Sequence, residues 1–332
     1  MTAASVRFRR TSALVLASAL LAGCGTGAPE RRGDRNAPSA PGFPVTLDNC
    51  GVRTTYERPP ERVVTIHQHP TEVMLALGLG DRLVGTAFPD SAPLPGHARE
   101  FRGLPVLSER EPSFETVLAA EPDFVYGGFD SAFAVQEGRS REAFAEAGID
   151  TRLNLEYCGR GRTSMADAYA EIRAVGSVFG VRERADRLVA ELRRRVEDAH
   201  RAVRGARAVP VLVYDSGQRT AYTAGGRSLA TDVIALAGGR NVFADLDEVF
   251  GDVSWEQVAE RRPEAIVIHD YEGGGSLERK KEFLRSHPAL AEVPAVREER
   301  FVTLPLAATL VGVRPPHAVA ELARGLHPER FR

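Results

Sequence analysis

The feature that most constrains the fold of this chain is an internal repeat. The segment SFETVLAAEPDFVY at residues 113–126 returns as SWEQVAERRPEAIV at residues 254–267. Each copy begins with a serine suited to a helix N-cap, continues with apolar residues near helical spacing, and reaches a proline before a β-branched run. Each copy therefore predicts a helix followed by a strand, and Ser254 with Gln257 has the spacing of a capping box. A duplicated unit in 332 residues predicts two lobes.

The first residues predict export and a lipid anchor. Three arginines precede the apolar run SALVLASALL, which is shorter than the ~20 residues that span a bilayer as a helix. We therefore expect a signal peptide over residues 1–23. The sequence LAGC resembles the bacterial lipobox, which implies cleavage before Cys24 and a lipidated, extracytoplasmic protein held at the cell membrane. An ordinary signal peptide with an unmodified cysteine is the alternative.

Residues 24–44 predict a flexible tether, because they are rich in glycine, proline and charge and lack hydrophobic periodicity. Two cysteines remain in the body, Cys50 and Cys158. In an exported chain this pair favours a disulfide, and two buried free thiols are the alternative. The net charge of −2 comes from acidic and basic residues mixed along the chain, which excludes the basic patch of a nucleic-acid-binding protein.

Strand and helix patterns alternate through both halves of the chain. A hairpin is expected around residues 49–51, followed by an N-terminal lobe over 45–162 and a C-terminal lobe over 205–332. Such alternation predicts an α/β fold in which each lobe has a parallel-type sheet covered by helices. Residues 163–204 predict a helical connecting region with one apolar stripe, and Gly176 and Gly180 are its weak points. We expect a single long rigid helix to join the lobes.

Polar and ring side chains follow the predicted strands. In open α/β sheets a ligand lies beyond the carboxyl ends of the strands, so these positions are the candidate ligand contacts. Tyrosine and histidine offer an apolar face and one polar tip, which suits a large, partly polar ligand. The candidates at strand ends are His67, Gln68, His69, Tyr126, Tyr157, Tyr214, His269 and Tyr271.

The sequence HQH at residues 67–69 leaves a metal-dependent hydrolase open as another class of function. A hydrolase of this kind would need further metal ligands after later strands, and His269 and Asp270 are the best candidates. Pro70 directly after the pair and the duplicated lobes count against it. No nucleophile with a matching base is recognisable, so we expect a protein without catalytic activity.

Four stretches, PERVVTIHQHPTEVMLALGLGDRLVGTAF, PSFETVLAAEPDFVYGG, VSWEQVAERRPEAIVI and GVRPPHAVAELA, resemble the class III substrate-binding proteins of ABC importers. This resemblance implies two lobes on one rigid helix, a ligand in the groove, and delivery to a permease dimer powered by a cytoplasmic ATPase. It also implies that a glutamate on each lobe docks with permease arginines, and the matching residues are Glu115 and Glu256. Simple complementation of a helix dipole is the alternative for both.

The family resemblance also limits the ligand. It favours a ferric siderophore, or a corrinoid or haem. Separately, we expect a monomeric protein without a resident cofactor. Arg314 in the GVR loop is a further candidate contact, with a salt bridge beside the last helix as its alternative. The pair of His67 and His69 departs from the Ser/Pro-rich turn of siderophore binders. A deazaflavin precursor, direct zinc or manganese binding, and a sensor in place of an importer subunit remain open.

Overall fold

The computed structural model describes residues 40–159 and 161–331, which belong to one compact unit. The predicted signal peptide, the lipidation site Cys24 and the tether as far as residue 39 lie outside the described residues. Within the described part, no helix combines the length and the apolar character needed to cross a membrane.

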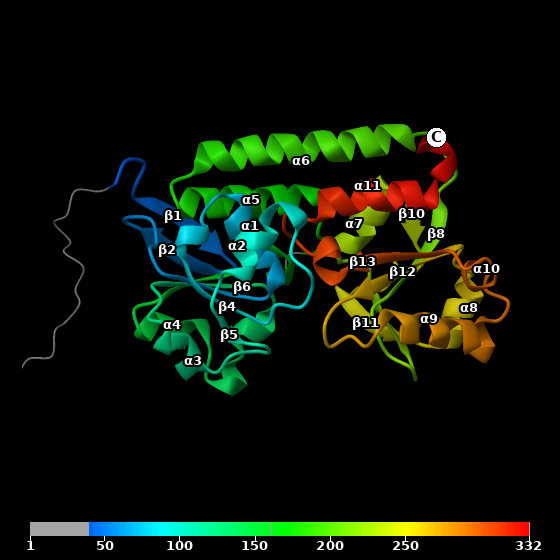
Figure 1. Ribbon diagram of the computed structural model, residues 1–332, viewed down its shortest axis with the longest axis horizontal. Helices are drawn as coiled ribbons and strands as arrows, with labels where there is room; N and C mark the ends of the chain where they lie inside the picture. The colour runs from blue at the N-terminus through cyan, green and yellow to red at the C-terminus, as the bar shows by residue number, and fades with distance from the viewer. Residues whose placement is uncertain (1–39, 160, 332) are drawn as a thin grey trace, which may run out of the picture. The chain divides into compact units, whose positions relative to one another are not determined.

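The N-terminal lobe contains a hairpin and a five-stranded sheet (Figure 1). The hairpin pairs β1 (Val45–Asn49) with β2 (Val52–Tyr56), as expected from the turn sequence. All neighbours in the larger sheet are parallel. Its order is β5 (Val106–Ser108), β4 (Leu83–Ala87), β3 (Val63–Ile66), β6 (Phe124–Gly127) and β7 (Asp150–Leu153). Its helices are α1 (Gln68–Ala76), α2 (Ala98–Arg102), α3 (Phe114–Ala119) and α4 (Arg141–Glu146).

The C-terminal lobe repeats this plan with a four-stranded parallel sheet. Its order is β10 (Gly239–Asn241), β8 (Val209–Tyr214), β12 (Ala265–Asp270) and β13 (Phe301–Pro305). An antiparallel ribbon of β9 (Ala221–Ala224) and β11 (Phe250–Val253), which was not predicted from the sequence, lies beside it. The helices are α7 (Leu229–Leu236), α8 (Trp255–Arg261), α9 (Leu277–Ser286), α10 (Pro294–Arg297) and α11 (Pro315–Leu326). The predicted α/β class is confirmed.

The connecting region is helical in two pieces, α5 (Met165–Val178) and α6 (Arg182–Ala202). The break falls at Gly180, whose φ of 69° is accessible to glycine at little cost. Gly176 allows the two helices to approach closely, because a Cβ there would lie 2.5 Å from the Cβ of Ala185. With 21 residues, α6 alone is roughly 31 Å long at the usual helical rise.

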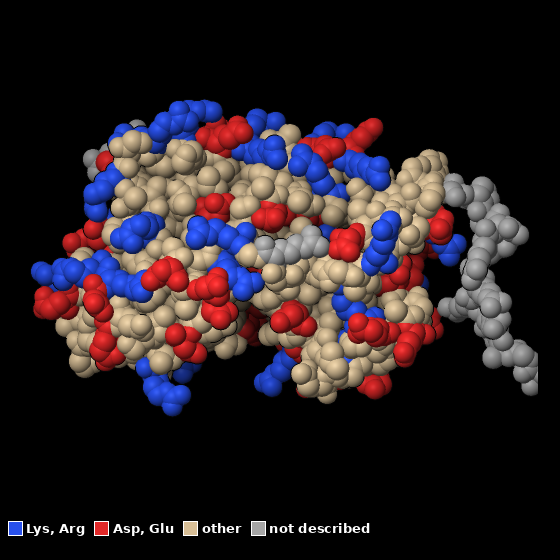
Figure 2. Space-filling view, turned by 180° about the vertical axis from the view of Figure 1, so that it is seen from behind, with Lys and Arg blue, Asp and Glu red and all other residues tan. Residues whose placement is uncertain are grey.

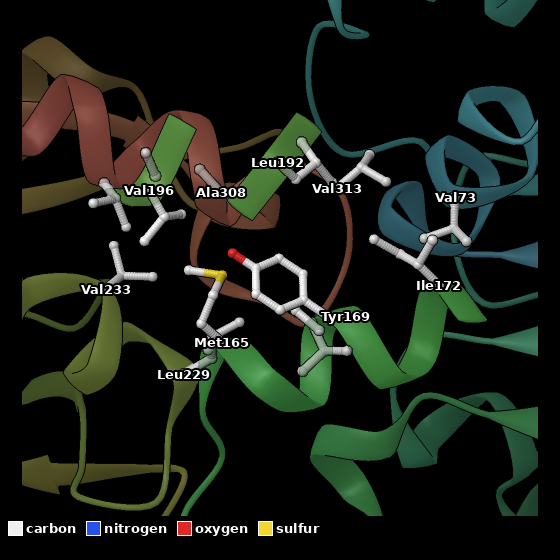
Figure 3. Packing of buried hydrophobic residues seen from close by; sticks show 14 of the residues in the cluster. Val73, Met165, Tyr169, Ile172, Leu192, Val196, Leu229, Val233, Ala308 and Val313 are labelled. Carbon is white, nitrogen blue, oxygen red and sulfur yellow. The ribbon is translucent and has the colours of Figure 1, made fainter. Parts of the chain in front are cut away.

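The largest hydrophobic core extends across both lobes. Figure 3 shows Tyr169 of α5 among side chains that come from α6, from α1 of the N-terminal lobe and from α7 of the C-terminal lobe. Separating the lobes on this side would expose that apolar surface to water, which is unfavourable. Movement of one lobe against the other is therefore restricted on the α5–α6 side.

The opposite faces of the two sheets have their own cores. Val64 and Val125 pack with Val117 of α3 in the N-terminal lobe, while Leu212 and Ile266 pack beneath α8 in the C-terminal lobe. Successive strand residues point to opposite faces, so α3 and α8 cover the sheet faces turned away from α6 (Figure 1). The two copies of the repeat therefore occupy equivalent places in the two lobes.

Both copies of the repeat begin with the expected serine cap. The hydroxyl of Ser113 accepts a hydrogen bond from the amide of Thr116, and Ser254 forms a full capping box with Gln257. The prediction of a helix followed by a strand is confirmed for both copies. A disulfide joins Cys50 in the β1–β2 turn to Cys158, with Cα atoms 4.7 Å apart.

Candidate ligand-binding groove

Loops at the carboxyl ends of the parallel strands line an open cavity of about 1420 Å³. Most of its lining comes from the N-terminal lobe, and Glu272 and Gly273 come from the loop after β12. A second cavity of about 680 Å³ shares these two residues and is lined also by Asp90 and Tyr271. Seen from behind, the lower edge of the molecule is notched between the lobes, and basic and acidic residues are mixed over that face (Figure 2).

His67 lies at the end of β3 in an unusual backbone conformation, with φ 81°. Its side chain is fully buried, and Nε2 lies 2.8 Å from the Glu111 carboxylate. The hydroxyl of Ser131 and the guanidinium of Arg139 also donate to the Glu111 carboxylate. Burial raises the pKa of Glu111, but the hydrogen bond and charge of His67 outweigh it, and the pKa falls to about 2. This carboxylate is therefore ionised and held in place.

His69 is buried without any hydrogen-bond partner in the described structure, and both of its ring nitrogens are unsatisfied. Burial, together with the charge of His67, lowers the pKa of His69 to about 3. Phe129 covers both rings, with centroid distances of 4.5 Å to His67 and 5.1 Å to His69. Gly128 is required here, because a Cβ would lie 2.4 Å from the His69 ring. A neutral, desolvated imidazole can accept a hydrogen bond or bind a metal.

Replacing His69 by leucine is expected to raise the free energy of unfolding at pH 7 by about 1–3 kcal/mol, because it removes buried polar atoms that have no partner. The pKa of His69 is about 3 in the folded protein and near 6.5 in the unfolded chain. The folded state therefore keeps its stability above pH 6.5 and loses it as the pH falls toward 3, because the unfolded chain binds the proton first. The advantage of the variant should therefore grow by about 3 kcal/mol between pH 7 and pH 4. Urea unfolding at both pH values measures this.

The matched control for this prediction is His97→Leu, at a histidine that is only partly buried. Its Nδ1 lies 3.6 Å from the exposed carboxylate of Glu100, so the substitution is expected to change the free energy of unfolding by less than about 1 kcal/mol at either pH. A His69→Leu variant that is less stable than the parent protein at pH 7, and whose free energy of unfolding changes with pH as the parent's does, would contradict the assignment of a buried, uncharged imidazole without partners at this position.

His269 of the C-terminal lobe is fully buried, like His69, but its ring nitrogens are both engaged. Nδ1 lies 3.0 Å from Asp215, and Nε2 lies 2.9 Å from the hydroxyl of Thr309. Tyr271 donates to the same carboxylate at 2.9 Å. Burial raises the pKa of Asp215, but the hydrogen bond and charge of His269 outweigh it, and the net shift is downward. Because its nitrogens are occupied, His269 is a structural group in this conformation.

Polar contacts also join the lobes directly. Arg314 forms a buried, bidentate ion pair with Glu72 of α1, which is the salt-bridge alternative considered for it above. Glu156 lies in the short 3-10 helix Leu155–Tyr157 and accepts bonds of 3.0 Å from the amides of Leu229 and Val311. Burial raises the pKa of Glu156 to about 7. These contacts add polar links to the shared hydrophobic core.

The remaining predicted residues lie outside the linings of these two cavities. Tyr126 is buried and donates to Glu171, and Tyr214 is buried and donates to the carbonyl of Gly217. Gln68 is buried and donates to Glu72, and the ring of Tyr157 lies 5.2 Å from that of Phe129. Of the nine predicted ligand contacts, Tyr271 alone lines either of the two cavities described here.

The cavity lining was mostly missed from the sequence. The principal residues are Phe88, Glu111, Ser131, Arg139 and Glu272. Phe88 and Glu111 follow β4 and β5, so the strand-end rule would have found them had it been applied to those two strands. Nothing in the sequence pattern marks Ser131 or Arg139, because they lie on a loop with several short turns.

Comparison with known proteins agrees with this architecture. A family model described as "Periplasmic binding protein" matches residues 63–308. YvrC, an ABC transporter substrate-binding lipoprotein of Bacillus subtilis, is 25% identical over 326 residues, 97% of each chain. A vitamin B12-binding protein of Pectobacterium carotovorum is 24% identical over 225 residues, 66% of this chain and 73% of its own.

A solved structure gives the same result. The protein of an ABC-type Fe3+-hydroxamate transport system from Saccharomonospora viridis superposes with a TM-score of 0.75 and 27% identity, over 86% of this chain and 99% of that one. The family and fold expected from the sequence are thereby confirmed. With the family model covering most of its length, this chain belongs to the periplasmic binding protein family.

Proposed function

We propose that this protein captures a metal chelate in the groove between its lobes and delivers it to the permease of an ABC importer. The observation that carries the proposal is the cavity of about 1420 Å³ at the carboxyl ends of the parallel strands. It exceeds the few hundred to ~1,000 Å³ of ordinary small-molecule sites. A ferric siderophore is the first choice, and a corrinoid or a haem the second.

The relatives support a ligand of this kind. One is named for vitamin B12 and another for a Fe3+-hydroxamate transport system, and both names describe a metal held inside an organic chelator. These relatives are binding proteins of transporters, so we propose capture and delivery without catalysis. The apolar ring of Phe88 in the cavity wall and the nearby Phe129 suit a large organic ligand.

Direct capture of a bare zinc or manganese ion has less support. Such a site requires three or four converging His, Cys, Asp or Glu ligands. In residues 40–159 and 161–331, no group of three or more such side chains is arranged to hold a metal. His67 and His69 lie side by side with ring centroids 6.3 Å apart, but the former is already bonded to Glu111.

Docking to the permease is proposed to use Glu115 and Glu256, with lipidated Cys24 holding the protein at the membrane. Both glutamates are exposed in the first turns of α3 and α8. Within the described part of the chain, neither carboxylate has a basic partner within 4.0 Å. Because α3 and α8 are equivalent in the repeat, one anionic contact from each lobe suits a permease built from two equivalent subunits.

Titration calorimetry of the purified protein tests the proposed ligand class. The probes are a ferric trihydroxamate, haemin and cyanocobalamin, with zinc chloride and manganese chloride as bare-ion controls. We expect one chelate to bind at a one-to-one ratio with micromolar or tighter affinity, roughly −8 kcal/mol or better. Tight binding of a bare ion, with no binding of any chelate, would overturn the proposal in favour of an ion-binding protein.

A further inference from the structure

The two neighbouring cavities are lined by more acidic than basic side chains. The acidic residues are Asp90, Glu109, Glu111, Glu137, Asp270 and Glu272. The basic residues are Arg110 and Arg139. The charge that a ligand meets depends on which of these groups are already paired within the protein.

Arg139 is the basic residue that the protein itself engages. It is 3% exposed, and one terminal nitrogen lies 3.1 Å from Glu111 and donates to the carbonyl of Pro112. The other terminal nitrogen donates to the carbonyl of Ser131. The charge of Glu111 is therefore compensated within the protein by Arg139 and by His67, whose Nε2 lies 2.8 Å from the same carboxylate. The Nε–H group of Arg139 is buried and has no hydrogen-bond partner among the described residues.

The acidic residues at the mouth of the cavity are not compensated in this way. Glu109, Glu137 and Glu272 are exposed, and no basic group of the described residues lies within 4.0 Å of their carboxylates. Arg110 is the single exposed base in the lining. Asp270 lies near the buried ammonium group of Lys280, whose pKa is lowered by burial and is partly restored by the charges of Asp215 and Asp270. Asp90 is buried, and burial raises its pKa to about 6, so it does not belong to the exposed set.

We infer that this groove selects chelates that carry no net negative charge. Three free carboxylates against one free guanidinium give the mouth a negative potential, and a concave site screens such a potential less than a flat surface does. A carboxylate-bearing or catecholate chelate would be repelled, whereas an uncharged or cationic one would not. The inference rests on the proposed function, because it specifies which chelates the same groove accepts.

Two ferric trihydroxamates with the same cyclic peptide scaffold give a matched test. Ferrichrome is uncharged, while ferrichrome A carries free carboxylates. We expect ferrichrome to bind at least about tenfold more tightly at low ionic strength, since each like-charge contact near a protein surface weakens binding by that order. Raising the salt concentration should narrow the gap. Cyanocobalamin, which is uncharged, and haemin, which bears propionates, form a second pair for a tetrapyrrole-type ligand.

A triple variant, Glu109→Gln, Glu137→Gln and Glu272→Gln, is expected to remove most of the discrimination by strengthening binding of the anionic member of the pair. The control triple is Glu57→Gln, Glu146→Gln and Glu298→Gln. These residues are exposed and line neither cavity, so the control changes the net charge equally and should leave the discrimination intact.

The outcomes separate the two proposals. Equal or tighter binding of the anionic chelate by the unaltered protein would overturn the charge inference while supporting capture of chelates. Equal loss of discrimination in the control triple would overturn the assignment to these three carboxylates. Failure of every chelate to bind would overturn the proposed function and, with it, the inference.

Discussion

Reversing the charges of Glu115 and Glu256 together, by Glu→Lys at both positions, is expected to reduce uptake of the chelate at least about tenfold while its affinity for the protein stays unchanged. Both carboxylates are ionised near neutral pH, because each accepts a hydrogen bond from its own backbone amide and from the capping serine, which lowers its pKa. They lie on helices that cover the sheet faces turned away from α6, outside the cavity lining. Uptake by cells and calorimetry of the purified variant measure the two quantities.

Glu142 offers a close control for the helix-terminal chemistry. It is exposed in the first turn of α4, behind the cap Ser140, and its own amide and that serine lower its pKa in the same way. Glu142→Lys therefore carries the same local cost at a helix N-terminus without belonging to the repeated pair. Uptake should survive this change. Unaltered uptake in the double variant, or an equal loss in the Glu142 variant, would remove the docking assignment.

Glu171→Gln is expected to lower the free energy of unfolding by about 3–5 kcal/mol, because it leaves a buried guanidinium without its counter-charge. Glu171 of α5 is fully buried and accepts bonds of 2.8 Å and 2.6 Å from Arg152 of β7. It also accepts a 2.6 Å bond from the hydroxyl of Tyr126 on β6. These contacts fix α5 to the N-terminal sheet. Urea unfolding followed by circular dichroism gives the change.

The triple variant Glu171→Leu, Arg152→Met and Tyr126→Phe removes every member of the same network. Replacing a complete buried polar group by apolar residues of similar volume is often nearly neutral. The triple variant should therefore regain most of the stability lost in Glu171→Gln. If the single substitution costs less than about 1 kcal/mol, the pair is not the buried anchor inferred here.

The sequence predicted the duplicated α/β plan because both copies carry strong local signals. A serine cap, helical spacing, a proline and a β-branched strand all agree around Ser113 and around Ser254. The β9–β11 ribbon was missed because its strands are short, and because Gly251 and Asp252 in β11 have low strand propensity. The ribbon forms because β9 and β11 pair in the folded protein, which the local sequence of either strand does not reveal. The break in the connecting helix was underestimated at Gly180, whose left-handed conformation ends α5.

The sequence predicted that a cavity would lie at the carboxyl ends of the strands, but it identified few of the residues that line the cavities. The strand-end rule brought out His67, His69 and Tyr271, which lie in or beside the cavities. It also selected Tyr126 and Tyr214, which point into cores, because successive strand residues face opposite sides and the rule does not say which side a side chain takes. Whether Arg314 meets a ligand or an internal acid depended on Glu72, 242 residues earlier in the chain.

Native mass spectrometry of the untagged protein, isolated from its own host, tests most directly whether the groove holds a sizeable chelate. We expect a retained ligand that adds hundreds of daltons more than a bare ion would, at a one-to-one ratio, and that leaves when the protein is unfolded. A protein that carries or takes up a single metal ion, and no organic ligand under any growth condition that supplies chelates, would contradict the account.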